Sequence, residues 1–155
     1  MKDIKGYFWD SNVLRVFSDT PAHPVLSQHL ARASWDIIFL PSIVVAESWR
    51  GRLRRADSVP KLKPEQAIFP HEQLVKTHDV LRQFETIAFD REAADELSRL
   101  QRKVKHRKKR HADMMIAAMA LSNRFVLVTR NERDFADLLL PQQVENWIDN
   151  PPVLR

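Results

Sequence analysis

The chain has 155 residues, of which 44% are hydrophobic and 29% charged, and this length and balance suit a single domain spanning residues 1–155. It contains no cysteine, which excludes disulfide scaffolds, thiolate zinc sites and cysteine nucleophiles. Its formal net charge of +5 favours encounter with polyanions such as nucleic acid. The opening residues lack the apolar core of a secretory leader and no long apolar span follows, so we expect a cytoplasmic protein without a membrane anchor.

The first half of the chain alternates short apolar runs with helical patterns. An aromatic run at 7–9 predicts a strand, and the helix-capping residues at 10–12 introduce helical spacing that extends toward residue 33. A β-rich run at 37–40 ends at Pro41, after which Ser42 is expected to cap a helix from 43 to about 55. The basic residues within that helix are predicted to lie on its solvent-exposed surface; they are Arg50, Arg52, Arg54 and Arg55.

The second half continues the same alternation after a proline-containing connection between residues 50 and 70. We predict a helix over 71–85, a short strand at 87–89 and a helix capped by Asp90. A helix that is apolar on all sides begins near Asp113, and the β-branched run at 125–129 is typical of a buried central strand. Strands alternating with helices predict an α/β fold with a parallel sheet.

Two polar residues follow predicted strands. Asp10 follows the strand at 7–9, and Asn131 follows the strand at 125–129, so both are expected at the carboxyl edge of the sheet, where open parallel sheets bind ligands. Each also has a purely structural interpretation. Asp10 is a preferred helix cap, and Asn131 with Asp134 has spacing close to that of a capping box.

Two further acids lie among apolar residues. Glu47 lies within the apolar helix that begins at 43, and Asp113 begins the apolar helix of residues 113–121. Partial exposure would explain Glu47, and the helix dipole would explain Asp113. If both helices pack against the sheet edge that holds Asp10, three carboxylates converge and raise one another's pKa unless a cation compensates. Oxygen ligands without cysteine favour Mg²⁺ or Mn²⁺.

The chain resembles the PIN-domain ribonucleases, and among them the toxins of VapBC-type toxin–antitoxin pairs. The motifs that carry the resemblance cover nearly the whole chain in order; they are DSNVL at 10–14, PSIVVAE at 41–47 followed by RG at 50–51, DMMIAAMAL at 113–121, LVTRNERDF at 127–135 and VENW at 144–147. The resemblance implies a PIN-like three-layer α/β/α sandwich, with a short central parallel sheet flanked by helices.

The resemblance also implies site residues and an activity. Asp10, Glu47 and Asp113 match the metal-binding acids of the family, and Asn131 lies where many PIN domains have an aspartate. Residues that would support the site are Asp134, Ser11, Asn12 and Thr129. The implied activity is endoribonuclease cleavage of RNA with Mg²⁺ or Mn²⁺, and the implied partners are RNA, a cognate antitoxin and a second copy in a homodimer, with no membrane involved.

A basic run at 102–111 leads directly into Asp113. It is either a solvated helix end or a cationic surface that guides phosphates to the acids, and the expected RNA contacts are Arg107, Lys108, Lys109 and Arg110, together with Arg130. Two alternatives remain for the function of the chain. One is a housekeeping RNA-processing nuclease, and the other is a catalytically silent RNA-binding or regulatory module in which Asn131 replaces a metal-binding aspartate.

Overall fold

A parallel sheet forms the centre of the molecule. The computed structural model describes residues 3–104 and 110–153, and within them the sheet has five strands in the order β3-β2-β1-β4-β5. The strands are β1 (Tyr7–Trp9), β2 (Ile38–Pro41), β3 (Glu85–Ile87), β4 (Val126–Val128) and β5 (Val144–Glu145). β1 pairs with β2 on one side and with β4 on the other. β4 pairs with both β1 and β5, so the prediction of an interior strand at 125–129 is confirmed for residues 126–128.

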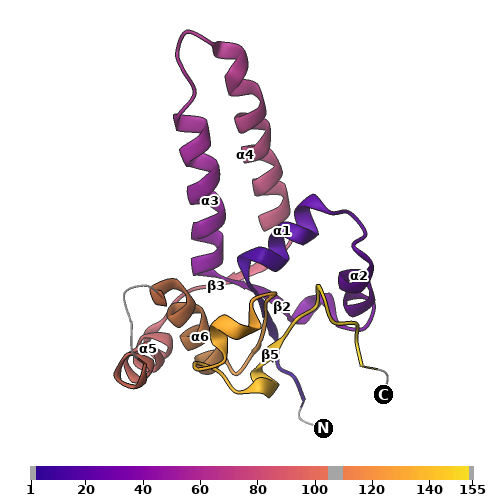
Figure 1. Cartoon of the computed structure of the whole chain (residues 1–155), viewed down its shortest axis with the longest axis vertical. Coiled ribbons are helices and arrows are strands. Elements are labelled where there is room, and N and C mark those ends of the chain that lie inside the picture. Colours follow the sequence, from indigo (N-terminus) through magenta and orange to yellow (C-terminus); the bar gives the residue numbers. More distant parts are fainter. Residues whose placement is uncertain (1–2, 105–109, 154–155) are drawn as a thin grey trace.

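Helices flank this sheet and complete the predicted α/β/α sandwich (Figure 1). They are α1 (Ser11–Asp19), α2 (Pro24–Leu30), α3 (Ser42–Asp57), α4 (Ile68–Leu81), α5 (Arg91–Lys103) and α6 (His111–Asn123). Short 3₁₀ helices, labelled η, occur at η1 (Trp35–Ile37), η2 (Pro64–Ala67), η4 (Glu132–Phe135) and η5 (Pro141–Gln143). No helix in the part of the chain that the structure describes is long and apolar enough to cross a bilayer.

The core lies between the sheet and its helices. Phe8, Trp9 and Leu127 are fully buried, because interior strands of a parallel sheet are covered on both faces. The middle of α6 is buried, at Met114 and from Ile116 to Ala120, as its apolar sequence predicts. Trp9 also packs edge-on against Phe17 and Trp147, so aromatic contacts join β1 to α1 and to the segment after β5.

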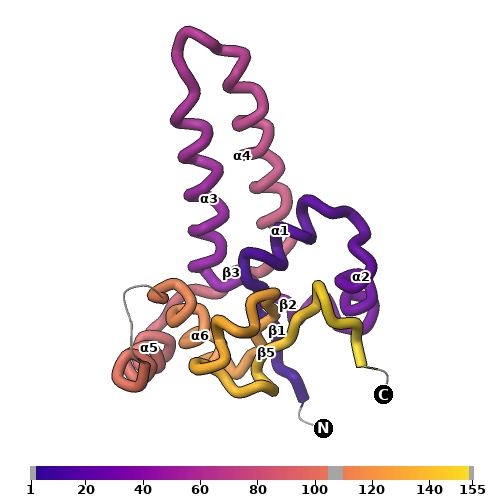
Figure 2. The backbone as a smooth tube through the Cα atoms, viewed as in Figure 1, coloured from indigo at the N-terminus to yellow at the C-terminus, as the bar shows by residue number. Residues whose placement is uncertain are grey.

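α3 and α4 form a helical hairpin that projects from the body of the molecule (Figures 1 and 2). Its second helix begins at Ile68 rather than at the predicted residue 71, since Pro70 falls in the first turn, where a missing N–H costs nothing. The strand after it is β3, two residues before the predicted 87–89. β3 is an edge strand, and its exposed Glu85 and Thr86 do not show the apolar pattern that marks a buried strand.

Two predicted features near the start of helices differ from the structure. Ser42 is the first residue of α3 and its hydroxyl does not cap that helix; it accepts a hydrogen bond from the Phe89 backbone N–H at 3.1 Å instead. The helical pattern from residue 11 toward 33 forms two helices, because Pro21 and the left-handed Ala22 (φ 56°) separate α1 from α2.

Candidate metal and nucleic-acid site

Asp10 is held at the carboxyl edge of the sheet between β1 and β4. It is only 6% exposed, and its Oδ1 accepts a hydrogen bond from the Ser11 backbone N–H at 2.8 Å. Its Oδ2 accepts from the Thr129 hydroxyl at 2.8 Å and from the Asn12 side-chain amide at 3.3 Å. Asp10 therefore occupies the N-cap position of α1, and its carboxylate is also fixed by a residue from the end of β4.

Thr129 links this carboxylate to the loop after β4. Its side chain is fully buried, and its hydroxyl oxygen accepts hydrogen bonds from the Asn131 backbone N–H at 3.1 Å and from the Asn12 amide at 3.2 Å. The Asn12 carbonyl oxygen in turn accepts from the Arg130 backbone N–H at 3.0 Å. These bonds join the start of α1 to the β4 loop, so Asn12 and Thr129 fix the orientation of Asp10.

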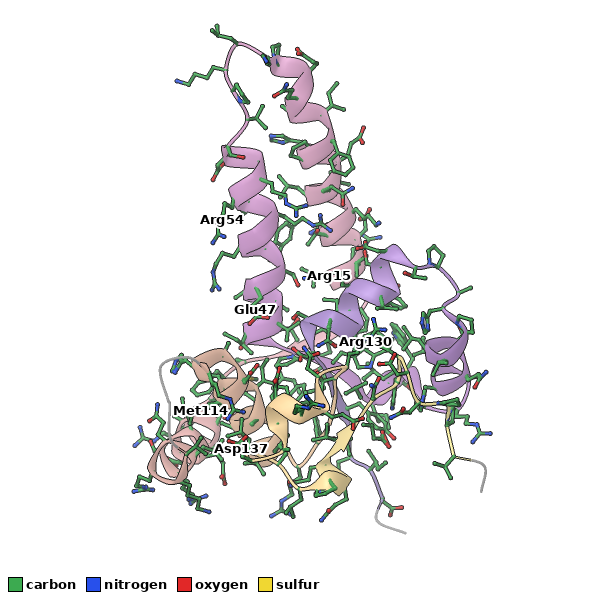
Figure 3. All side chains as sticks on the ribbon, viewed as in Figure 1. Arg15, Glu47, Arg54, Met114, Arg130 and Asp137 are labelled. Atoms are coloured by element: carbon green, nitrogen blue, oxygen red, sulfur yellow. The ribbon has the colours of Figure 1, made fainter. Side chains whose placement is uncertain are left out.

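Two helices bring the other acids toward Asp10. Glu47 lies near the base of α3, the end of that helix next to α1 (Figure 3), and Asp113 lies in the first turn of α6. Both side chains are half-buried. The negative charge of Asp10 acts on both of them. The structure therefore gathers three acids that are far apart in the sequence into one electrostatic cluster.

The environment of the three acids favours their protonated forms. Burial is the main reason that the pKa of Asp10 is raised, and the hydrogen bonds from Thr129, Ser11 and Asn12 oppose that rise. Burial is the main cause that raises the pKa of Glu47, and the charge of Asp10 is the next. A hydrogen bond from the side chain of Ser11 opposes this rise.

Asp113 shows the same pattern. Burial, then the charges of Asp10 and Asp134, raise its pKa, whereas the Arg110 guanidinium lowers it. Charged carboxylates held this way are unfavourable unless a cation joins them.

The three acids fit a hard dication by their chemistry. They offer carboxylate oxygens, which Mg²⁺ and Mn²⁺ prefer, and each would be favoured in its charged form by a nearby cation. Oδ1 of Asp10 accepts only one of the hydrogen bonds described above, which leaves it a lone pair for an ion. Within residues 3–104 and 110–153, however, no three His, Asp or Glu side chains are close enough together to form a ready-made metal cage.

The loop after β4 places an aspartate, not Asn131, in the electrostatic field of the cluster. Asn131 is exposed and precedes η4, and its side chain makes no capping hydrogen bond, so the predicted capping box does not form. Asp134 is also exposed, but its charge raises the pKa of both Asp10 and Asp113. Of the two residues that the sequence singles out here, Asp134 is the one that adds negative charge.

The basic residues expected to contact RNA fall into two groups, those outside the described residues and those that form ion pairs within the chain. Arg107, Lys108 and Lys109 lie outside the described residues. Arg110 forms an ion pair with Asp137 at 2.6 Å and also donates to the backbone carbonyl of Asp134. The Arg130 guanidinium donates through Nε and Nη2 to the two carboxylate oxygens of Asp149, at 3.1 and 3.0 Å. Both described arginines are thus already paired within the chain.

A groove between α1, α3 and α4 adjoins the acid cluster and was not anticipated from the sequence. Its volume is about 430 Å³, and Ser11 and Glu47 lie in its wall. Arg15 from α1 and Arg52 and Arg55 from α3 also line it. The spacing of the two α3 arginines, three residues apart and hence on one helix face, is the sequence signal that could have indicated a shared surface.

Comparisons with known proteins agree with this architecture. Three solved structures cover most of this chain and nearly all of their own: a toxin–antitoxin complex from Klebsiella pneumoniae (22% identity, 92% of this chain, 98% of that chain, TM-score 0.62), FitAcB from Neisseria gonorrhoeae (21%, 93%, 99%, 0.65) and DNA-bound VapBC from Salmonella typhimurium (21%, 93%, 99%, 0.65). At these identities the likeness shows a shared fold. No curated protein matches the sequence.

A family model gives the assignment directly. The model described as "PIN domain" matches residues 7–138. That range runs from the first residue of β1 through η4, and so contains Asp10, Glu47, Asp113 and the loop that follows β4. The family resemblance seen in the sequence is confirmed, and the chain belongs to the PIN-domain family.

Proposed function

We propose that this protein is a metal-dependent endoribonuclease that acts as the toxin of a type II toxin–antitoxin pair. The observation that carries the proposal is the convergence of Asp10, Glu47 and Asp113 at the carboxyl edge of a parallel sheet. Burial raises the pKa of Asp10, and the charge of Asp10 helps to raise the pKa of Glu47 and of Asp113. A cluster of this kind suits a dication and a phosphodiester substrate. Membership of the PIN-domain family supports nuclease chemistry.

The residues of the chain divide the work of the reaction. Asp10, Glu47 and Asp113 would hold Mg²⁺ or Mn²⁺. When bound, such an ion polarises a phosphoryl oxygen and lowers the pKa of water, so that hydroxide is available near neutral pH. Thr129 and Asn12 orient Asp10 through their hydrogen bonds, and a fixed carboxylate keeps its ligand oxygen in place as the substrate binds.

The comparisons support one of the proposed partners, an antitoxin. The similar structure from Klebsiella pneumoniae is a toxin–antitoxin complex, and the one from Salmonella typhimurium is DNA-bound VapBC. We therefore propose that a cognate antitoxin neutralises this chain. From the family resemblance we also propose that the chain forms a homodimer and acts on RNA in the cytoplasm.

The proposal is tested by cleavage of total cellular RNA with the purified full-length chain in Mg²⁺ or Mn²⁺. We expect cleavage that excess chelator stops, and at least a hundredfold loss of rate in Asp113→Asn, because that variant removes one charge from the cluster while keeping the side-chain shape. Asp57→Asn, which removes an exposed carboxylate at the end of α3, is the matched control and should cleave at the wild-type rate.

Two results would contradict the nuclease assignment. The first is cleavage that persists in Asp113→Asn or in chelator, which would indicate a contaminating enzyme. The second is RNA binding without any cleavage by the wild-type chain, which would favour a silent RNA-binding module. Growth arrest on expression of the wild-type chain, but not of Asp113→Asn, is the further result expected of a toxin and not of a housekeeping nuclease.

A further inference from the structure

The groove between α1, α3 and α4 has a cationic wall whose arginines form no ion pair with the described residues. We call it the arginine groove and define it by Arg15, Arg52 and Arg55. None of these three forms an ion pair within 4 Å with any residue that the structure describes. The aspartate in its lining, Asp19, is paired with Lys76 at 3.3 Å.

The groove arginines come from two helices, Arg15 from α1 and Arg52 and Arg55 from one face of α3. Ser48, Gly51, Arg52 and Arg55 line the groove from α3, and their spacing of three and four residues places them on one face of that helix. Arg52 is also fixed, since its Nε donates to the buried Thr77 hydroxyl of α4 at 3.2 Å. Arg54 lies on a different face of α3, pointing away from α4 (Figure 3), and does not line the groove.

A glycine keeps the middle of the groove open. Gly51 lies inside α3, where glycine destabilises a helix by about 1 kcal/mol relative to alanine. A Cβ placed there would meet no atom within 4 Å, so helix packing does not require a glycine. The absence of a side chain instead widens the space between the arginines, where a ligand can approach the helix closely.

We propose that the arginine groove binds the phosphate backbone of single-stranded RNA next to the bond that is cleaved. This rests on the proposed function, because it names the substrate contact of the same site. Guanidinium groups bind phosphates through paired hydrogen bonds, and a volume of about 430 Å³ is the size of a small-ligand pocket, which suits a short length of single strand and not a duplex.

The position of Glu47 favours RNA over an acidic protein segment. Glu47 belongs both to the groove wall and to the acid cluster, and Ser11, also in the wall, donates its backbone N–H to Asp10. A strand seated on the arginines therefore continues toward the dication that the acids would hold. An acidic peptide would instead bring more carboxylates toward Glu47 without a scissile phosphate to place there.

The experiment measures binding of a fluorescein-labelled 12-nucleotide single-stranded RNA of mixed sequence by anisotropy over a range of salt concentrations. The full-length chain carries Asp113→Asn, so that the RNA stays intact. We expect Arg15→Gln, Arg52→Gln and Arg55→Gln together to weaken binding at least tenfold. The triple variant should also make the slope of log K for RNA binding against log salt concentration shallower by about 2. Each of the three phosphates that is no longer neutralised accounts for roughly 0.7 of that change.

A charge-matched triple variant provides the control. Arg54→Gln, Arg82→Gln and Arg91→Gln remove the same net charge from exposed positions outside the groove and should keep the original salt slope. Gly51→Phe provides a second route, since its ring fills the open space without removing charge. It should weaken RNA binding without lowering the melting temperature.

The outcomes separate this inference from the proposed function. Equal salt slopes for the two triple variants, or RNA binding unchanged in both the groove triple variant and Gly51→Phe, would overturn the arginine groove as an RNA site. Tighter binding of poly-glutamate than of RNA, abolished in the groove variant, would overturn it in favour of a protein partner. If the wild-type chain does not cleave RNA, the proposed function fails, yet the salt slopes still decide the groove.

Discussion

At the scale of single residues, the site is built from one buried carboxylate and several that are partly exposed. Asp10 is fixed by hydrogen bonds from two elements, whereas Glu47 and Asp113 are placed by the helices that carry them. The loop after β4 then contributes Asp134, whose charge reaches both Asp10 and Asp113. A cation at the cluster would therefore be attracted by Asp134 even without direct contact.

This predicts a difference between the two polar residues of the loop after β4. Asp134→Asn should weaken binding of Mn²⁺ by about tenfold, the size of effect that outer residues have on metal sites, whereas Asn131→Ala should change it less than twofold. Isothermal titration of the purified chain with Mn²⁺ measures both. Glu132→Gln, an exposed neutralisation in the same 3₁₀ helix, is the control for local charge.

A larger loss of Mn²⁺ affinity in Asn131→Ala than in Asp134→Asn would contradict this prediction and would mean that Asn131 is itself a metal ligand. The sequence alone does not decide between the two residues, for a physical reason. Asn131 and Asp134 both follow a buried strand, which predicts their sheet edge, but the direction of each side chain depends on the 3₁₀ turn between them. By contrast, the sequence predicts that Asp10 and the loop holding Asn131 share one edge, because each follows a predicted parallel strand, and these two strands are adjacent in the sheet.

At the scale of elements, the approach of β1 to β4 depends on a glycine. A Cβ on Gly6 would lie 2.7 to 2.9 Å from ring atoms of Phe125. That ring has little freedom to move, since it stacks on Phe39 at 5.0 Å and contacts Phe8 edge-on at 4.9 Å. The small residue before β1 therefore allows the aromatic layer to form beside the sheet.

The two glycines of the chain should respond oppositely to substitution by alanine. Gly6→Ala is expected to lower the free energy of unfolding by about 1–3 kcal/mol through overpacking. Gly51→Ala should raise it by about 0.5–1 kcal/mol, because alanine favours the helix and meets no neighbour. Urea denaturation measures both values. A neutral Gly6→Ala would show that Phe125 can move aside.

The elements that sequence predicts best are those with one strong physical signal. β1, β4 and α5 lie close to their predicted positions, since a buried apolar run or the Asp90 cap marks each of them; the Asp90 carboxylate accepts from the Ala93 N–H at 2.9 Å. The apolar pattern places β3 two residues too late, because an edge strand tolerates exposed polar residues. The projecting α3–α4 hairpin follows no local pattern either, because it depends on how two helices pair.

At the scale of the whole molecule, the acid cluster lowers the stability of the folded chain when no cation is bound. Folding raises the pKa of Asp10, Glu47 and Asp113 above the ordinary values of 3.8 for Asp and 4.5 for Glu. Between those ordinary values and the raised ones, the folded state binds more protons than the unfolded state. The contribution of these acids to the free energy of unfolding therefore falls as pH rises through that interval, and stays low above it.

This linkage predicts how melting temperatures respond to pH and to Mg²⁺. In chelator, Asp113→Asn should melt at the same temperature as the wild type near pH 3, where the carboxyl is protonated in both states. At pH 7 it should melt higher, by a shift on the order of 2 °C, because the wild type then carries the unfavourable charge. Mg²⁺ at a hundred times its dissociation constant should raise the wild-type melting temperature by roughly 5–10 °C, and raise that of the variant much less.

The comparison with a control separates the cluster from the general acid response of the protein. Asp57→Asn removes an exposed carboxylate outside the cluster, so its melting temperature should follow the wild type at every pH and in Mg²⁺. Differential scanning calorimetry from pH 3 to pH 8 provides the measurement. A difference between Asp113→Asn and the wild type that does not change with pH would mean that the charge of Asp113 is not the cause. Equal stabilisation of both by Mg²⁺ would place the ion elsewhere on the molecule.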